Sequence, residues 1–144
     1  MAKRSIIIGW REWVALPSLG IPRIKAKIDT GARTSALHAF DISETHKGRQ
    51  TIIHFKVSPL QGQPGKILVV EAPLLDKRIV KDSHGRKSLR PVIPVAVELG
   101  GLRWDIEVTL IDRSDMSFRM LLGRQAVRAA RFLINPGRSY LLGR

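Results

Sequence analysis

The 144-residue chain carries 25 lysines and arginines against 12 acidic residues and has no cysteine, so its formal net charge is +13. The absence of cysteine excludes disulfides, cysteine-ligated zinc and thiol catalysis, and no run approaches the roughly 20 apolar residues of a transmembrane helix. We therefore expect one soluble, cytoplasmic domain that spans residues 1–144.

The positive charge is spread evenly along the chain, because basic residues outnumber acidic ones to a similar degree in each third. It therefore belongs to the folded surface and not to a basic tail. Such a surface attracts polyanions, among them nucleic acid, ribosomes, anionic membranes and acidic peptides. A charged face kept only for solubility would have both signs mixed.

Alternating apolar and polar side chains predict several short strands before the middle of the chain. They lie at residues 5–10, 12–16, 24–28, 36–42, 51–58 and 67–72. A polar turn is expected at residues 44–48 and a loop, rich in proline and glycine, at residues 58–65.

The second half of the chain predicts a hairpin, a helix and a closing strand. Residues 95–99 and 104–111 form the hairpin, turned by two adjacent glycines, and residues 124–134 form the helix. Residues 138–142 are a candidate final strand. Many short strands and one clear helix indicate a mainly β, barrel-like fold.

Asp29, Thr30 and Gly31 directly follow the strand at residues 24–28. The strand therefore delivers a carboxylate to a tight loop, in which Gly31 allows close backbone approach and the Thr30 hydroxyl can brace the loop. Taken alone, the triplet is also explained by a turn in which Asp29 bonds the backbone two residues further on.

A second apolar segment ends in glycine far downstream, at Leu121, Leu122 and Gly123, directly before the predicted helix. Together with Asp-Thr-Gly-Ala at residues 29–32, it resembles the retropepsin-like aspartic peptidases, whose half-site combines these two elements. Residues 12–39, 72–76, 90–93 and 110–124 are similar to the bacterial family often named ATP-dependent zinc proteases, itself retropepsin-like. The resemblance covers most of the chain and implies the closed barrel of the acid-protease fold with one C-terminal helix.

The resemblance also implies a homodimer. Aspartic peptidases need two carboxylates that share one proton, because like charges about 3 Å apart cannot both ionise. The chain has one Asp-Thr-Gly, so Asp29 must meet its symmetry mate across a twofold axis. Thr30 would bond across to the partner loop, and Leu121, Leu122, Gly123 and Arg124 would support the site. The apolar segments at residues 5–8 and 140–142 are candidate interface strands.

Arg33 departs from viral retropepsins, which usually have an acidic residue there that pairs with the arginine matched here by Arg124. Two arginines replace that salt bridge, so an ordinary preference for apolar peptides is not expected. Residues 77–92 lie where the resemblance places the flap, and they are strongly basic, although an ordinary exposed hairpin would carry charge as well.

These features predict an acidic or glutamate-rich peptide substrate, since guanidinium groups bind carboxylates bidentately. The candidate substrate-binding residues are Ala32, Arg33, Lys81, His84 and Arg86. The resemblance implies the same substrate class, because relatives are associated with glutamate ligases and with trimming glutamate tails from a ribosomal protein.

Neither zinc nor ATP is expected, despite the family's common name. The chain has no His-Glu-x-x-His and no phosphate-binding loop of the G-x-x-x-x-G-K-[ST] type. Its four histidines, His38, His46, His54 and His84, lack the spacing of zinc ligands, and His38 is expected to be a partly buried structural residue. We predict no metal and no cofactor.

Two other functions remain open. The charge would suit a non-catalytic β-barrel module that binds nucleic acid or the ribosome, with Trp10, Trp13, Phe55, Trp104 and Tyr140 as stacking groups. These aromatic residues are scattered in the sequence, which favours core packing for them. A retropepsin-like protein that binds without cleaving is the third possibility.

Overall fold

The computed structural model describes residues 5–59, 66–81, 84–113 and 118–143, and the structural statements below refer to these residues. Most of them lie in strands. The strands are β1 (Ile7–Gly9), β2 (Arg11–Leu16), β3 (Ile21–Asp29), β4 (Ser35–His38), β5 (Phe40–Lys47), β6 (Gln50–Val57), β7 (Leu68–Pro73), β8 (Asp76–Lys81), β9 (Lys87–Leu99), β10 (Leu102–Ile111), β11 (Met120–Gly123) and β12 (Leu133–Asn135). A 3₁₀ turn (Pro17–Leu19) follows β2, and helix α1 (Arg124–Ala129) follows β11.

The main sheet closes into a barrel. Its hydrogen-bonded order is β10-β4-β11-β3-β2-β9-β8, and β9 also pairs with β10, so the strands from β10 to β9 form a ring with β8 attached outside it. One register pair, Ala15 with Glu98, joins β2 to β9. The mainly β prediction is confirmed, but the barrel is not a clean one, because a single residue pair joins β2 to β9 and two smaller sheets stand outside the ring.

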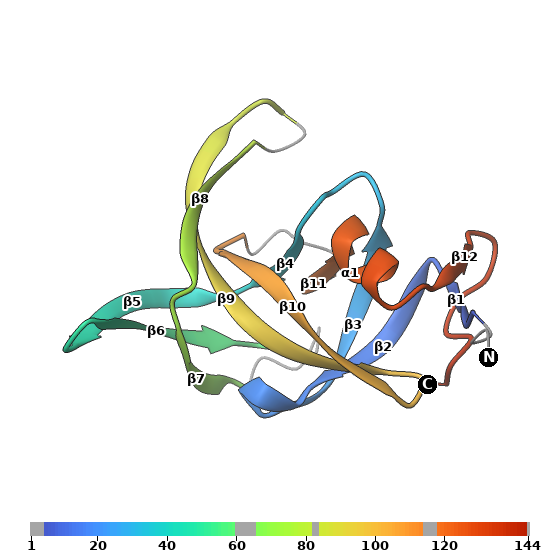
Figure 1. The fold of residues 1–144 in the computed structure, drawn as a ribbon, viewed down its shortest axis with the longest axis horizontal. Helices are drawn as coiled ribbons and strands as arrows, with labels where there is room; N and C mark the ends of the chain where they lie inside the picture. Colours follow the sequence, from blue (N-terminus) through green and yellow to red (C-terminus); the bar gives the residue numbers. More distant parts are fainter. Residues whose placement is uncertain (1–4, 60–65, 82–83, 114–117, 144) are drawn as a thin grey trace.

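The barrel interior is filled by the apolar side of each strand. Ile24, Ala26 and Ile28 of β3 point inward, while Lys25 and Lys27 alternate outward, as the sequence pattern predicts. A three-stranded sheet, β5-β6-β7, and a parallel pair, β1-β12, extend from the barrel on different sides (Figure 1).

A buried carboxylate ties the chain ends to the barrel. Glu12 is fully buried in β2, and its Oε2 accepts hydrogen bonds from the backbone N–H of Gly9 at 2.7 Å and of Leu141 at 2.9 Å. Its Oε1 accepts a third from the N–H of Leu142 at 3.2 Å. Charge-assisted bonds of this kind satisfy an ion that would otherwise be costly to bury.

Helix α1 is shorter than predicted. It ends at Ala129, Arg131 adopts a left-handed conformation with φ 58°, and Leu133–Asn135 forms strand β12 beside β1 instead of continuing the helix. The reversal directs Phe132 into the core, where its ring packs edge-on against Trp104 at 5.4 Å. In the described part of the chain no helix is long and apolar enough to cross a membrane.

Two other predictions are wrong at residue level. The turn expected at residues 44–48 is displaced, because β5 continues to Lys47 and the chain reverses at Gly48, with φ 60°. Residues 138–142 form no strand, because their backbone is held by Glu12 and by the carbonyl of Arg11. Part of the loop expected at residues 58–65 lies outside the described residues.

The predicted hairpin turned by Gly100 and Gly101 is present, and these two glycines have φ angles of 61° and 78°.

We predict that Glu12→Gln lowers the free energy of unfolding by about 1–3 kcal/mol, because one acceptor oxygen becomes an amide donor that faces backbone donors. Glu71→Gln, a change of the same chemistry on the exposed strand β7, is the control and should shift stability by less than about 0.5 kcal/mol. Urea denaturation followed by circular dichroism measures both. Equal effects of the two substitutions would contradict a special role for Glu12.

Candidate active site

Strands β3 and β11 lie side by side and bring the two sequence motifs together. They pair in parallel with the register Leu121 to Lys27, Leu122 to Ile28 and Gly123 to Asp29. The carboxylate thus leaves the end of one strand where the other passes into helix α1. Leu122 is buried and Leu121 half-buried, which fixes β11 in the barrel.

Gly123 packs directly against the backbone of the returning chain. A Cβ at this position would lie 2.6 Å from the carbonyl carbon of Thr34 and 2.9 Å from the nitrogen of Ser35. The N–H of Gly123 donates to Ser35 Oγ at 3.0 Å, and Thr109 Oγ1 donates to the Ser35 carbonyl at 3.2 Å. Ser35 and Thr109 are both 2% exposed. Sequence reasoning missed them, because neither stands in a motif.

The loop after β3 orients the Asp29 side chain. Asp29 Oδ1 accepts the N–H of Gly31 at 3.1 Å, and the Asp29 carbonyl accepts the N–H of Ala32 at 3.2 Å. The simple turn interpretation therefore holds as a local contact. The side chain is nevertheless half-buried and not sealed, so solvent and substrate can reach it.

The beginning of α1 clamps the same loop. The N–H of Arg124 donates to the Ala32 carbonyl at 2.7 Å, and the N–H of Gln125 donates to the Arg33 carbonyl at 3.1 Å. Arg124 Nη1 donates to the Thr30 carbonyl at 3.1 Å. The loop is held by main-chain acceptors, so it does not depend on the acidic partner that Arg33 replaces.

The predicted substrate-binding residues lie on two separate elements. Ala32 and Arg33 belong to the β3–β4 loop, and the Arg33 side chain is exposed. Lys81, His84 and Arg86 are exposed at the tip of the β8–β9 hairpin, which stands out from the barrel as an arm (Figure 1). The hairpin is therefore present where the flap was predicted. Residues 82–83 at its turn lie outside the described residues.

Ion pairs anchor the base of this hairpin to the barrel. Arg78 of β8 donates from Nη2 to both carboxylate oxygens of Glu107 on β10 at 3.0 Å, and from Nε to Asp76 at 3.0 Å. The hydrogen bond from Arg78, and then that from the N–H of Lys77, lower the pKa of Asp76. The bond to Glu107 raises the pKa of Arg78. The arm thus rises from a fixed base.

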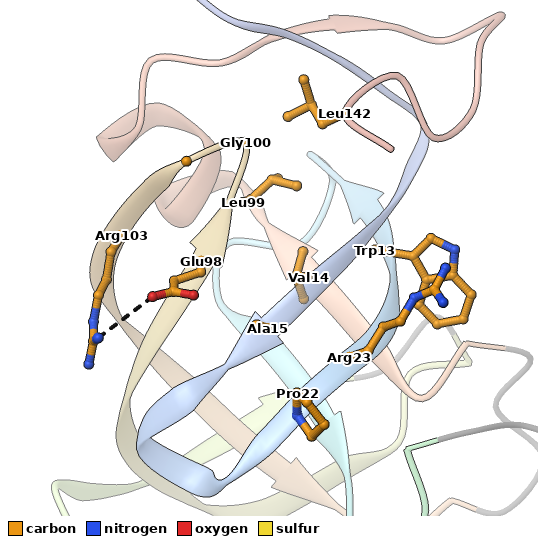
Figure 2. A pocket seen from close by; sticks show the side chains of 11 residues that line it. Trp13, Val14, Ala15, Pro22, Arg23, Glu98, Leu99, Gly100, Arg103 and Leu142 are labelled. Atoms are coloured by element: carbon orange, nitrogen blue, oxygen red, sulfur yellow. Dashed lines mark ion pairs between the residues drawn. The ribbon is translucent and has the colours of Figure 1, made fainter. Parts of the chain in front are cut away.

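A pocket of about 390 Å³ lies at the opposite end of β3, next to Pro22 and Arg23 (Figure 2). The six residue-to-residue steps from Arg23 to Asp29 span about 20 Å of extended strand, so this pocket is remote from the carboxylate. A peptidase cleft built between two copies would not be enclosed by one chain. The pocket is therefore separate from the candidate active site.

The described residues contain no group of three or more His, Asp or Glu side chains placed to hold a metal ion. His38 is buried, and its Nδ1 accepts the N–H of Arg113 at 3.1 Å, which fits the structural role predicted for it.

Comparison with known proteins agrees with this geometry. The model of the RimB-like family, described as the retropepsin-like aspartic endopeptidase RimB, matches residues 7–144. The chain belongs to this family. A crystal structure of a Legionella pneumophila protein of unknown function superposes with a TM-score of 0.79 at 27% identity, over 96% of this chain and 99% of that one.

The curated relatives are longer proteins with a different name. A Shewanella pealeana protein named "Probable alpha-L-glutamate ligase" is 41% identical over 143 residues, which are 99% of this chain and 31% of that protein. A Parasynechococcus marenigrum protein of the same name is 44% identical over 140 residues, 97% of this chain and 30% of its own length. This RimB-like chain thus spans about a third of the curated relatives that it matches.

We predict that Gly123→Ala lowers the free energy of unfolding by about 1–3 kcal/mol, because its methyl group would collide with backbone and not with a side chain that can turn away. Gly137→Ala, where the added carbon would meet only the Asn135 side chain at 3.5 Å, is the control and should be nearly neutral. Thermal unfolding of both variants measures the difference. A Gly123→Ala variant as stable as the wild type would show that β11 and the backbone of Thr34 and Ser35 can move apart at little cost.

Proposed function

We propose that this chain is one half of an aspartic endopeptidase that works as a twofold homodimer on acidic, glutamate-containing peptides. The supporting observation is the half-buried Asp29 carboxylate, oriented by the Gly31 N–H at the point where β3 meets Gly123. Membership of a family described as retropepsin-like aspartic endopeptidases supports the same reaction.

The proposed dimer supplies the second carboxylate. Asp29 of each copy would lie against the twofold axis, and the pair would hold one proton between them. The ionised carboxylate takes a proton from a water molecule as its oxygen attacks the scissile carbonyl, and the protonated one donates to the carbonyl oxygen. The carboxyl group that took the water proton then donates it to the leaving amine nitrogen as the C–N bond breaks. The other carboxylate takes back the proton of the former carbonyl oxygen as the product carboxyl group forms.

The rest of the loop prepares the carboxylate for this work. Bonds from α1 to the carbonyls of Thr30, Ala32 and Arg33 restrain the loop before substrate binds. A group held in its reactive geometry loses less entropy in the transition state. Thr30 is exposed, which suits a contact with the corresponding loop of the second copy.

The substrate class follows from charge and from the relatives. Arg33 is exposed next to the Asp29 loop, while the Arg124 guanidinium is engaged by Thr30, so Arg33 is the better candidate for binding a substrate carboxylate. Lys81 and Arg86 add positive charge at the tip of the arm. Relatives named as glutamate ligases carry a segment like this chain, which supports a peptide that contains added glutamate.

A binding domain without catalysis is the second candidate, because the curated relatives bear a ligase name. Such a domain would bind glutamate-rich peptide through the same arginines and leave it intact. The Asp29 variant below separates the two functions. If the chain only binds, neither the wild type nor the variant would cleave the peptide.

Asp29→Asn is expected to abolish cleavage of a glutamate-rich peptide while the fold and the dimer persist, because the amide cannot act as a base. Mass spectrometry of the products and analytical ultracentrifugation measure the two properties. The wild type and the variant are then mixed in equal amounts and allowed to exchange subunits. If both carboxylates of a dimer are needed, the mixture should have about one quarter of the activity of wild type at the same total concentration. Independent subunits would give about one half. A result of one half would refute the shared site.

Arg33→Glu should lower kcat/KM for a glutamate-rich peptide by about tenfold or more, through repulsion of the substrate carboxylates. Arg49→Glu makes the same charge change at the exposed β5–β6 turn and should alter kcat/KM by less than about twofold. A neutral peptide of the same length is the second control, because Arg33→Glu should not impair its cleavage. An equal loss for both peptides would place Arg33 in catalysis or folding and not in substrate choice.

A further inference from the structure

Aromatic and basic side chains alternate across the outer face of β2 and β3, together with the segment that follows β12. We call this surface the aromatic–basic stack. Its members are Trp10, Arg11, Trp13, Arg23, Lys25 and Tyr140. The strand register creates it, because Trp13 of β2 lies opposite Lys25 of β3. Core packing, expected for Trp13 and Tyr140 from sequence, is therefore wrong, whereas Phe55 is buried as predicted.

Trp13 is the centre of the stack. The Arg23 guanidinium lies 3.8 Å from the centroid of the Trp13 ring, and Lys25 Nζ lies 5.2 Å from it. The Tyr140 ring is stacked on Trp13 with centroids 6.2 Å apart and planes inclined by 26°. Arg11 then lies 5.0 Å from the Tyr140 centroid and 4.5 Å from that of Trp10. Flat groups and positive charges thus follow one another in a continuous row.

The stack borders the pocket at the far end of β3. Trp13 and Arg23 line its wall, with Glu98 and Arg103 from the two sides of the β9–β10 hairpin (Figure 2). Glu98 and Arg103 form an ion pair at 3.6 Å. The volume of about 390 Å³ lies within the range of sites for small organic groups. A flat ring could enter it beside Trp13, with positive charge on two sides.

We propose that this surface binds single-stranded RNA, with one nucleotide in the pocket and its neighbours along the stack. Polyanions with flat, unpaired rings match a row of aromatic and guanidinium faces, because bases stack on both and phosphates pair with the cations. Glutamate-rich peptide carries the same charge but no rings. The Glu98 carboxylate supplies an acceptor for a ribose 2′-hydroxyl, a donor that DNA lacks.

The pocket at the Arg23 end of this surface is remote from the proposed peptidase site. The pocket end of the stack, at Arg23, lies about 20 Å along β3 from Asp29, so a nucleotide in the pocket leaves the β3–β4 loop accessible. The other end of the stack, at Arg11 and Trp10, lies beside Lys27 and Ile28 and therefore close to Asp29. A nucleotide bound in the pocket would leave the β3–β4 loop free to receive a peptide.

The test uses the full chain and a fluorescently labelled, U-rich RNA about 12 nucleotides long, a length typical of single-strand sites. Anisotropy gives the Kd of the wild type, of Arg23→Glu and of Arg49→Glu, which carry equal net charge. Arg23→Glu should weaken binding by about tenfold or more, and Arg49→Glu by less than about threefold. Both residues are exposed, so both variants should fold. Trp13→Phe should lose most of the tryptophan quenching that RNA produces.

Several results would overturn the proposal. Equal losses for the two charge reversals would mean binding to the general charge of the protein. A DNA strand of the same sequence that binds as tightly as RNA would exclude the role of Glu98. Competition by a glutamate-rich peptide at equal charge concentration would assign the surface to acidic peptides. Asp29→Asn should leave RNA affinity unchanged, and a loss there would join the two sites.

Discussion

The close approach of Gly123 to the backbone of Thr34 and Ser35 is the contact on which the candidate site depends. It allows β11 to lie beside β3 while the chain returns as β4 on the other side of β11. The Ser35 hydroxyl and carbonyl then connect β11 to β10 through Thr109. Strands β4, β10 and β11, which are distant in sequence, are thereby fixed beside the Asp29 carboxylate. At Gly123, where they meet, a side chain would collide with backbone.

Local patterns could predict the barrel and the two halves of the site, because each is encoded over a few neighbouring residues. The alternation of β3 and the glycine after Leu122 are examples. The role of Glu12 could not be predicted, since its three donors include residues near the other end of the chain. The end of α1 was missed for a similar reason. Burial of Phe132 against Trp104 overrides the helical pattern that continues in the sequence.

The aromatic–basic stack could not be predicted from the sequence either. In sequence, Tyr140 and Trp13 are too far apart to suggest a common surface, and each alone is better explained by burial. The antiparallel register of β2 and β3 and the carboxylate of Glu12, which holds the segment at Leu141, place them together on the outside. Interleaving of rings and charges is thus a property of the folded sheet and not of the sequence.

The positive charge of the protein is divided between structural and exposed uses. Arg78 and Arg124 are engaged by Glu107 and by the Thr30 carbonyl, so they stabilise the arm and the loop. Arg33 and Arg23 are exposed at the two ends of β3, one beside the carboxylate and the other beside the pocket. A twofold axis near Asp29 would bring the Arg33 ends of two barrels together and direct the Arg23 ends outward. In such a dimer the proposed shared cleft would take the peptide, and the two pockets beside Arg23 would remain for the proposed RNA.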